Sequence, residues 1–287
     1  MIISASRRTD IPCFYSEWFM NRLKAGYVLS KNPMNPAQIK RISLSPNDVD
    51  CIVFWTKDPQ NMLDKLPDIS QLGYRYYFQF TLNPYGRELE RNLRDKADIV
   101  QTFVQLAEHI GSRRLIWRYD PIVINDNYTV DYHIKSFEVL CSQLQGSTNR
   151  CIISFVDNYR KLKGTVREHI IRDIGEELQQ TIAGCFAKIA DSYGIELMAC
   201  CEQAALAAFG VKASACIDRG LIESICGYPL KVKRDKNQRQ GCNCAESVDI
   251  GVYNSCSNGC LYCYANHSET SIRKNIMRHD PEADILI

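Results

Sequence analysis

Three cysteines near the end of the chain have a spacing that can hold an iron–sulfur cluster. Cys256, Cys260 and Cys263 stand in the run Ser-Cys-Ser-Asn-Gly-Cys-Leu-Tyr-Cys-Tyr, separated by three and then two residues. Thiolates at this spacing can reach three corners of a cubane [4Fe–4S] cluster and leave the fourth iron without a protein ligand. An iron with an open position can bind a small molecule, whereas a cluster with four cysteine ligands mainly transfers electrons. The spacing therefore predicts a catalytic metal centre.

The motif resembles the signature of radical S-adenosylmethionine (SAM) enzymes. In that family three cysteines hold the cluster, and the amine and carboxylate of SAM chelate the fourth iron. The residue before the third cysteine is usually aromatic and lies near the adenine, which the resemblance implies for Tyr262. Most members carry the triad near the N-terminus, just after the first strand of a (β/α) barrel, so its position here is unusual.

A zinc site is the alternative for the same residues. Cys256, Cys260 and Cys263, together with another cysteine or His267, could form a closed tetrahedral knuckle. Cys-x2-Cys pairs often bind zinc. The aromatic Tyr262 and the three-residue first gap favour the cluster.

A second group of cysteines precedes the triad. The chain has 14 cysteines and no export signal, so metal ligation is a better interpretation than disulfides. Cys242 and Cys244 form a compact pair, Cys216 lies upstream, and Cys200 or Cys201 could supply a fourth ligand. Adjacent side chains on a strand point to opposite faces, so we expect only one of those two to ligate. The group predicts a second [4Fe–4S] cluster or a structural zinc.

Composition restricts the remaining possibilities. The chain has 287 residues, 45% of them hydrophobic, which suits one barrel-sized domain or two smaller ones. Its net charge of +2 provides no bulk attraction to nucleic acid or to anionic membranes. No apolar run approaches the ~20 residues that span a bilayer, and the first residues lack a signal-peptide pattern. We expect a cytoplasmic protein with no membrane partner and no nucleic-acid partner.

Short apolar runs alternate with longer helical patterns, which is typical of an α/β fold with a parallel sheet. We expect a TIM-like (β/α) barrel, complete or partial, over residues 1–200, and a cysteine-rich iron–sulfur region over residues 201–287 that closes or caps it. The expected strands are residues 2–6, 51–56, 74–82, 113–119, 151–156 and 195–201, and the expected helices are residues 15–24, 96–109, 131–144 and 175–193.

The C-terminal region repeats the order with which a radical SAM barrel begins. Residues 247–254 have the pattern of a strand, the triad follows, and residues 266–278 have the pattern of a helix. We therefore predict a permuted barrel, in which this unit docks beside the N-terminal strand and carries the cluster-binding loop. A separate cap over the barrel mouth is the competing arrangement. Both place the cluster near Arg7 and Asp10.

Polar residues follow several expected strands, and the carboxyl ends of parallel strands line the active site of such barrels. For any single one of them, a helix cap or a surface ion pair is an equally good interpretation. The candidate catalytic residues are Arg7, Asp10, Arg118 and Asp157, and the candidate cofactor contacts are Tyr262, Asn266, Asp120 and Ser154.

Motifs along nearly the whole chain resemble a bacterial family of unknown function that has a radical-SAM-like cysteine cluster at its C-terminus. They include Ser-Ala-Ser-Arg-Arg-Thr-Asp-Ile-Pro, Phe-Trp-Thr-Lys-Asp-Pro, Trp-Arg-Tyr-Asp-Pro-Ile, Ile-Ser-Phe-Val-Asp and the triad segment itself. The family pattern of Cys-x-Glu, Cys-Ile-Asp and Cys-x-Cys falls on Cys200, Cys216, Cys242 and Cys244, which favours Cys200 over Cys201. The resemblance implies a cluster-bearing SAM enzyme and gives no substrate.

The function we expect is reductive cleavage of SAM to a 5′-deoxyadenosyl radical that abstracts hydrogen from a small-molecule substrate. The electron would come from a reductase, a flavodoxin or a ferredoxin. One alternative is a zinc-stabilised module that binds protein or nucleic acid. Another is an iron–sulfur electron carrier or sensor without SAM chemistry. A basic stretch supports the nucleic-acid alternative, although it could equally be a solvated loop or hold a phosphorylated substrate; it contains Lys231, Lys233, Arg234, Lys236 and Arg239.

Overall fold

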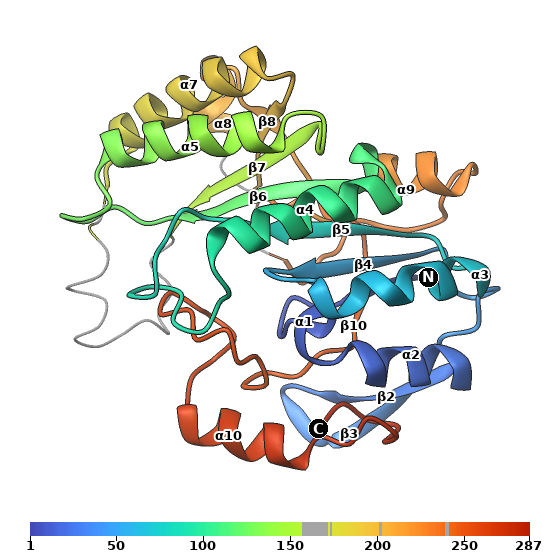
Figure 1. Cartoon of the computed structure of the whole chain (residues 1–287). Helices are drawn as coiled ribbons and strands as arrows, with labels where there is room; N and C mark the ends of the chain where they lie inside the picture. The colour runs from blue at the N-terminus through green and yellow to red at the C-terminus, as the bar shows by residue number, and fades with distance from the viewer. Residues whose placement is uncertain (157–171, 173, 201–202, 239–240) are drawn as a thin grey trace.

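Eight parallel strands form one sheet at the centre of the protein (Figure 1), as described by a computed structural model that covers residues 1–156, 172, 174–200, 203–238 and 241–287. The strand order is β10-β1-β4-β5-β6-β7-β8-β9. The bounds are β1 Ile2–Ala5, β4 Cys51–Thr56, β5 Tyr76–Thr81, β6 Leu115–Ile122, β7 Arg150–Phe155, β8 Glu196–Ala199, β9 Lys212–Ala213 and β10 Val248–Asp249.

Helices cover one face of the sheet, and the side chains on that face form the larger hydrophobic core. Phe54, Phe78 and Trp117 on the strands pack with Phe103 and Phe137 on the helices. The helices of the described chain are α1 Ile11–Phe14, α2 Ser16–Ala25, α3 Leu66–Gln71, α4 Lys96–Ile110, α5 Val130–Leu144, α7 Glu176–Ser192, α8 Gln203–Leu206, α9 Arg219–Cys226 and α10 Glu269–Arg278, with short 3-10 turns at Gln60–Lys65, Ser112–Arg114 and Ala207–Phe209.

The cysteine-rich part of the chain covers the opposite face of the sheet. Alternate strand residues point to that face. Val53, Tyr77 and Ile152 belong there to a second hydrophobic cluster that also contains Cys216 and Cys244. Tyr77 donates a hydrogen bond to the carbonyl oxygen of Cys216 over 2.8 Å. The upstream cysteine group therefore packs directly against the side chains on this face of the sheet.

The C-terminal strand lies beside the N-terminal one, as the sequence predicts. β10 pairs parallel to β1, with Ile3 opposite Val248 and Ser4 opposite Asp249. Asp249 fixes this contact, because its carboxylate accepts hydrogen bonds from Ser4 Oγ at 3.0 Å, Ser6 Oγ at 2.6 Å and the Arg7 amide at 2.9 Å. The two ends of the chain are thus brought together in one sheet.

The expected α/β class and parallel sheet are confirmed, but a closed barrel is not. Within the described residues, β9 and β10 stand at the two ends of the strand order and do not pair with each other. The six strands expected before residue 202 and the long helices are present with small shifts at their ends, whereas the strand expected over residues 247–254 is limited to Val248–Asp249. None of the described helices is long and apolar enough to cross a membrane.

An antiparallel hairpin was not predicted from the sequence. β2 Tyr27–Asn32 pairs with β3 Asn35–Ser43, outside the main sheet. Its sequence is rich in Asn, Lys and Arg and lacks a long apolar alternation, so the pattern that predicts a half-buried strand is weak. Leu29 also forms a bridge to Ile285 near the C-terminus, so distant residues stabilise the hairpin.

Candidate metal centre and active site

The triad lies in a loop that follows β10 and leads to α10. We call residues 255–265 the cluster loop. Segment 86–94 holds it in place: the Leu261 amide donates to the Leu89 carbonyl at 2.9 Å, and the Asn92 amide donates to the Asn258 carbonyl at 3.2 Å. The Tyr15 hydroxyl donates to the Ser255 carbonyl from the other side. Strand, cluster loop and helix thus follow in the predicted order.

Two glycines permit the close packing of this region. A Cβ at Gly251 would collide with the side chain of Ser6, so β10 could not approach the end of β1 so closely with a larger residue. Gly259 has a φ of +67°, and a Cβ there would lie 2.8 Å from Asn92 Nδ2. Glycine is the residue that adopts this conformation without steric cost. Both positions therefore support the path of the chain around the triad.

The three triad cysteines lie in one loop and are half-buried. Burial raises the pKa of Cys256 and of Cys263, and raises the pKa of Cys260 to about 12 although the Lys57 ammonium opposes this shift. The nearby Asp10 carboxylate adds to the rise in the pKa of Cys256 because it would repel a thiolate there. The thiols consequently keep their protons at neutral pH until a metal displaces them.

Amide groups are placed to stabilise triad thiolates. The Ala265 amide lies 3.4 Å from Cys263 Sγ. The Asn266 amide also hydrogen bonds to Cys263, and the Asn258 amide hydrogen bonds to Cys256. Hydrogen bonds to ligand sulfurs are a common feature of iron–sulfur sites and influence their potential. This donor arrangement fits a thiolate-bound metal group.

Tyr262 belongs to a buried charged cluster beside the triad. Its hydroxyl donates to Glu90 and lies 2.9 Å from Lys57 Nζ, which in turn contacts Glu90 Oε1 at 2.7 Å. Lys96 forms a second ion pair with Glu90. Burial opposes ionisation of Glu90, but the two ammonium groups outweigh it and hold the pKa of Glu90 below its usual range. Two cations and one anion therefore face Cys260, which favours a negatively charged group there.

Asp10 lies close to the triad and joins three segments. Its carboxylate caps α1 through the Cys13 amide at 3.1 Å, and it also accepts from the Lys57 amide at 2.8 Å and from Asn258 Nδ2 at 3.1 Å. Burial raises the pKa of Asp10 to about 6, although these hydrogen bonds oppose the shift. Asp10 thus connects the end of β1, the end of β4 and the cluster loop.

Arg118, Asp120 and Ser154 meet at the ends of β6 and β7. Arg118 forms an ion pair with Asp120, and Ser154 Oγ donates to the same carboxylate. The guanidinium of Arg118 also lies 5.4 Å from the ring of Trp55, and that of Arg7 lies 5.6 Å from the same ring. These candidate residues were predicted separately, from the ends of different strands. They are neighbours on the face of the sheet that the cysteine-rich segments cover.

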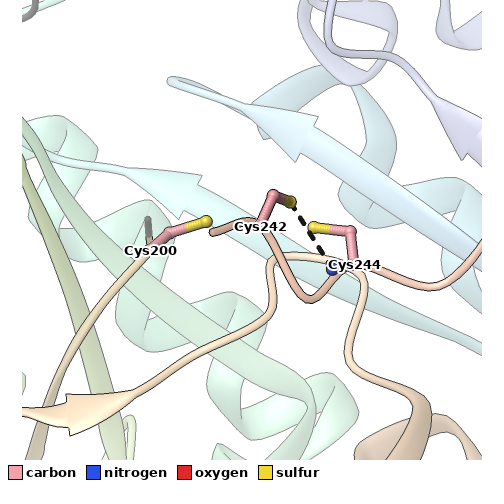
Figure 2. A group of neighbouring side chains, drawn as sticks. All are labelled: Cys200, Cys242 and Cys244. Atoms are coloured by element: carbon pink, nitrogen blue, oxygen red, sulfur yellow. Dashed lines mark hydrogen bonds between the residues drawn. The ribbon is translucent and has the colours of Figure 1, made fainter. Parts of the chain in front are cut away.

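The upstream cysteines also meet, as Figure 2 shows for three of them. The Sγ atoms of Cys200, Cys242 and Cys244 lie within 4.8 Å of one another. Cys200 directly follows β8, whereas Cys242 and Cys244 lie on a loop that folds back toward the sheet. Cys216 joins the group through hydrogen bonds with Cys200 and Cys244. The tertiary structure thus assembles the predicted second set from three separate segments.

Cys216 is the most acidic thiol of this second set. Hydrogen bonds from Cys200 and Cys244 lower its pKa well below the usual range of a thiol, and Arg118 lowers it further. Arg118 Nη1 lies 3.1 Å from Cys216 Sγ. The amides of Ile217 and Cys244 approach other sulfurs of the group at 3.4 and 3.5 Å. Four neighbouring sulfurs, one of them beside a guanidinium, are a suitable donor set for zinc or for an iron–sulfur cluster.

The two cysteine groups differ in how closely their sulfurs approach. Tetrahedral zinc requires ligand sulfurs at ~3.8 Å from one another, given Zn–S bonds of about 2.3 Å. Cys200, Cys242 and Cys244 of the second set lie within 4.8 Å of one another, whereas Cys216 is not part of that group. Among the residues described, the triad is not one of the groups with all ligand atoms within 4.8 Å. The wider triad suits a multi-iron cluster better than a single ion.

A polar network extends from one cysteine group to the other. Arg118 contacts Cys216 and Asp120, and the Asp120 amide donates to Asn83 Oδ1 at 2.9 Å. Asn83 Nδ2 lies 3.2 Å from the hydroxyl of Tyr262, which stands in the cluster loop directly before Cys263. Side chains from β6, from the end of β5 and from the cluster loop thus connect both candidate centres.

One predicted cofactor contact has an unsatisfied polar atom. Asn266 Nδ2 donates to the Cys256 carbonyl at 2.8 Å, while its buried Oδ1 atom has no hydrogen-bond partner among the described residues. The buried Nε1 of Trp55 is also without one in the part of the chain that the structure describes. A buried polar group without a partner is uncommon in proteins, and a water, an ion or a bound molecule can satisfy it. Both atoms are consistent with a bound group in this region.

Some site residues could be predicted from strand ends and some could not. Asp157 and Cys201 lie outside the described residues. Lys57 and Asn83 follow β4 and β5, so the rule that identified Arg118 also applies to them. Glu90 was missed, and no sequence signal marks it, because it lies in a loop without strand or helix periodicity.

Comparison with known protein families identifies the family of this chain. A family model described as domain of unknown function (DUF1848) matches residues 2–265, which include both cysteine groups. The chain belongs to this family. No curated protein matches it. The family assignment therefore agrees with the resemblance of the motifs and names no reaction.

Proposed function

We propose that this protein is a radical SAM enzyme whose cluster is held by Cys256, Cys260 and Cys263. The observation that carries the proposal is the cluster loop: three half-buried thiols, which do not all lie within 4.8 Å of one another, follow a strand at the edge of a parallel sheet. When bound, a three-cysteine [4Fe–4S] group supplies the chemistry of reductive SAM cleavage, which yields methionine and a 5′-deoxyadenosyl radical that takes hydrogen from a substrate.

The residues around the triad would bind and orient the reactants. Tyr262 and Asn266 flank Cys263 in the chain and present a phenol ring and an unpartnered amide oxygen, the latter judged among the described residues. The ammonium of Lys57 lies near Cys260 and would stabilise negative charge there. Arg7, Arg118 and Trp55 would exclude water from the face of the sheet that the cysteine-rich segments cover, and would hold a small-molecule substrate there.

The second set would hold an auxiliary [4Fe–4S] cluster or a zinc ion. Cys200, Cys216, Cys242 and Cys244 offer four sulfurs, so all ligand positions of a cluster would be filled by protein. Such a closed group suits electron transfer or structural support. A flavodoxin, a ferredoxin or a reductase would supply the electron for the triad.

Metal analysis of matched variants tests the proposal. The protein would be reconstituted anaerobically with iron and sulfide, reduced with dithionite and incubated with SAM, and 5′-deoxyadenosine would be measured by mass spectrometry. We expect about eight irons per chain in the wild type and about four in Cys256→Ala/Cys260→Ala/Cys263→Ala, with loss of SAM cleavage. The control Cys51→Ala/Cys141→Ala/Cys185→Ala removes three thiols outside both groups and should retain about eight irons.

A different outcome would identify the alternative. Stoichiometric zinc with no iron uptake in the wild type would refute the radical SAM proposal and favour a zinc-stabilised binding protein. In that case Lys231, Lys233, Arg234 and Lys236 would be the surface to test, because they are exposed beside the second cysteine set; Arg234 donates to the Cys242 carbonyl at 2.6 Å. Iron uptake without SAM cleavage would instead indicate an electron carrier.

A further inference from the structure

The ring of Trp55, near the end of β4, contacts two guanidinium groups from other parts of the sheet. The Arg7 guanidinium lies 5.6 Å from the ring centre and that of Arg118 lies 5.4 Å from it. The ring packs against the second hydrophobic cluster, on the face that the cysteine-rich segments cover. The aromatic face attracts each cation, but two cations at one ring also repel each other. This arrangement favours a negatively charged neighbour.

The arginines of this region differ in their counter-charges. Arg118 forms an ion pair with Asp120, and Arg8 lies 3.9 Å from the carboxylate of Asp249. The guanidinium of Arg7, by contrast, forms no ion pair with any residue that the structure describes, although its side chain is half-buried. Partial burial of an unpaired charge is unfavourable. Arg7 therefore contributes one positive charge that a bound anion would neutralise.

The indole N–H of Trp55 is available for the same anion. Its Nε1 atom is buried and has no hydrogen-bond partner among the described residues. The other two tryptophans differ in this respect: Trp18 Nε1 donates to the Ala283 carbonyl and Trp117 Nε1 to the Leu82 carbonyl, each at 2.9 Å. An indole nitrogen can only donate, so Trp55 needs an acceptor oxygen. A ligand that brings an acidic oxygen would satisfy both this N–H and the guanidinium.

The backbone of Arg7 is fixed by the C-terminal part of the chain, while its side chain is held loosely. The Arg7 amide donates to Asp249 at 2.9 Å, and the Arg7 carbonyl accepts from the hydroxyl of Tyr264 at 2.7 Å. Tyr264 directly follows Cys263 of the triad. The guanidinium itself makes a single long hydrogen bond to Ser247 Oγ, at 3.3 Å. Docking of the cluster loop thus positions Arg7 and leaves its guanidinium able to adjust to a ligand.

The triad lies close to this group along the same strand. Lys57 stands two residues beyond Trp55, and its ammonium is near enough to Cys260 to oppose the rise in the pKa of that thiol. A small molecule held at Trp55 by one end can therefore extend past Lys57 toward the triad. Such a molecule would have an anchored end and a reacting end.

We propose that Arg7 and Trp55 bind the carboxylate of the small-molecule substrate. This inference rests on the proposed function, since only that function makes the anchored molecule a substrate. One carboxylate oxygen would accept from the Arg7 guanidinium and the other from Trp55 Nε1, and hydrogen bonds of the first kind are strengthened by charge. A single unpaired cation matches the single charge of a carboxylate better than a phosphate monoester, which carries about −1.5 to −2 at pH 7.

NMR of the indole N–H groups tests this inference. The chain has three tryptophans, and Trp55→Phe would identify the signal of Trp55. The metal-free protein, kept reduced, would be titrated with butyrate, with uncharged butyramide and with butyl phosphate. We expect butyrate to shift the Trp55 signal downfield and butyramide to leave it in place. The signals of Trp18 and Trp117 should not move, because both already donate to carbonyls.

Matched variants assign the binding to Arg7. Equilibrium dialysis of radiolabelled butyrate would be carried out on the metal-free and on the reconstituted protein. We expect Arg7→Gln to bind butyrate about tenfold or more weakly than wild type. Arg75→Gln is the control, because Arg75 also lies over an aromatic ring, 5.7 Å from that of Tyr228, but precedes β5 at the opposite end of the strands. It should bind like wild type.

The outcomes separate the inference from the function on which it rests. An unshifted Trp55 signal in wild type, an equal shift with butyramide, or equal affinity in Arg7→Gln would overturn the site. Tighter binding of butyl phosphate would overturn the choice of a carboxylate, and displacement of butyrate by SAM would assign the site to SAM instead of the substrate. If Arg7→Gln does not fold, Trp55→Phe decides, and unchanged affinity in it overturns the site. Specific butyrate binding by a protein that takes up only zinc would support the carboxylate site and refute the radical SAM function.

Discussion

Replacing Glu90 by glutamine removes the carboxylate that both Lys57 and Lys96 contact. Glu90 is 1% exposed, Lys57 Nζ lies 2.7 Å from Oε1, and Lys96 pairs with the other oxygen. Glutamine keeps the shape and one hydrogen-bond acceptor, so packing is conserved. The two ammonium groups, which have 14% and 30% exposed side chains, would then face each other without a counter-charge.

The expected cost can be worked from these contacts. Breaking a buried ion pair costs about 3–5 kcal/mol because the remaining charge is uncompensated. Lys96 reaches water in part and the introduced glutamine would still accept one hydrogen bond, so we expect the free energy of unfolding of Glu90→Gln to fall by about 3 kcal/mol. Urea unfolding of the metal-free protein at pH 7 measures this change. Glu108→Gln, the same substitution at an exposed site on α4, is the control and should change stability by at most about 0.5 kcal/mol.

A double-mutant cycle identifies the source of the effect. Lys57→Met/Glu90→Gln removes one of the two stranded charges, so it should be more stable than the sum of the two single changes implies, with a coupling of about 1–3 kcal/mol. A loss below about 1 kcal/mol in Glu90→Gln, or additive single changes, would refute the conclusion that ion pairing stabilises this cluster.

Three further changes test other parts of the structure. His133 is buried, with Nδ1 near Tyr119 Oη and Nε2 near the Val123 carbonyl, and burial lowers its pKa to about 4. The unfolded chain therefore binds more protons than the folded one, so wild type should lose about 2 kcal/mol more unfolding free energy than His133→Gln between pH 7 and pH 5. Equal losses in the two proteins would contradict this pKa. Arg118→Met should weaken zinc binding by the second cysteine set about 10-fold or more in a chelator competition at pH 7, because Cys216 loses its cationic neighbour, while Arg150→Met should leave the affinity unchanged. Asp249→Ala removes three hydrogen bonds between β10 and the end of β1, so it should lower the free energy of unfolding by about 2–4 kcal/mol and expose residues after β9 to limited proteolysis. Protease resistance equal to that of wild type would argue against this role of Asp249.

The candidate metal ligands could be predicted from the sequence to a large extent, because cysteine chemistry is local. The spacing of Cys256, Cys260 and Cys263 limits which metal groups these thiols can reach at once, whatever the rest of the fold does. The strands were also predictable, since runs such as residues 51–56 are apolar on both faces, as parallel strands buried on both sides must be.

The partners of those residues could not be predicted in the same way. Glu90 has no periodic pattern around it, and its ion pairs with Lys57 and Lys96 form only when segment 86–94 folds against the cluster loop. The contact between Arg118 and Cys216 joins residues 98 positions apart. Such pairs depend on the folded path of the chain, which a local pattern does not encode.

The sequence by itself determined which residues can bind metal, that the fold is α/β, and that strand, triad and helix follow one another at the C-terminus. The tertiary structure alone decided that the sheet stays open between β9 and β10 among the described residues, that Arg118 contacts Cys216, and that charged groups surround Tyr262. The physical reason is that ligand type and hydrophobic period are properties of neighbouring residues, whereas convergence depends on how the sheet orders its strands and on which faces are buried together.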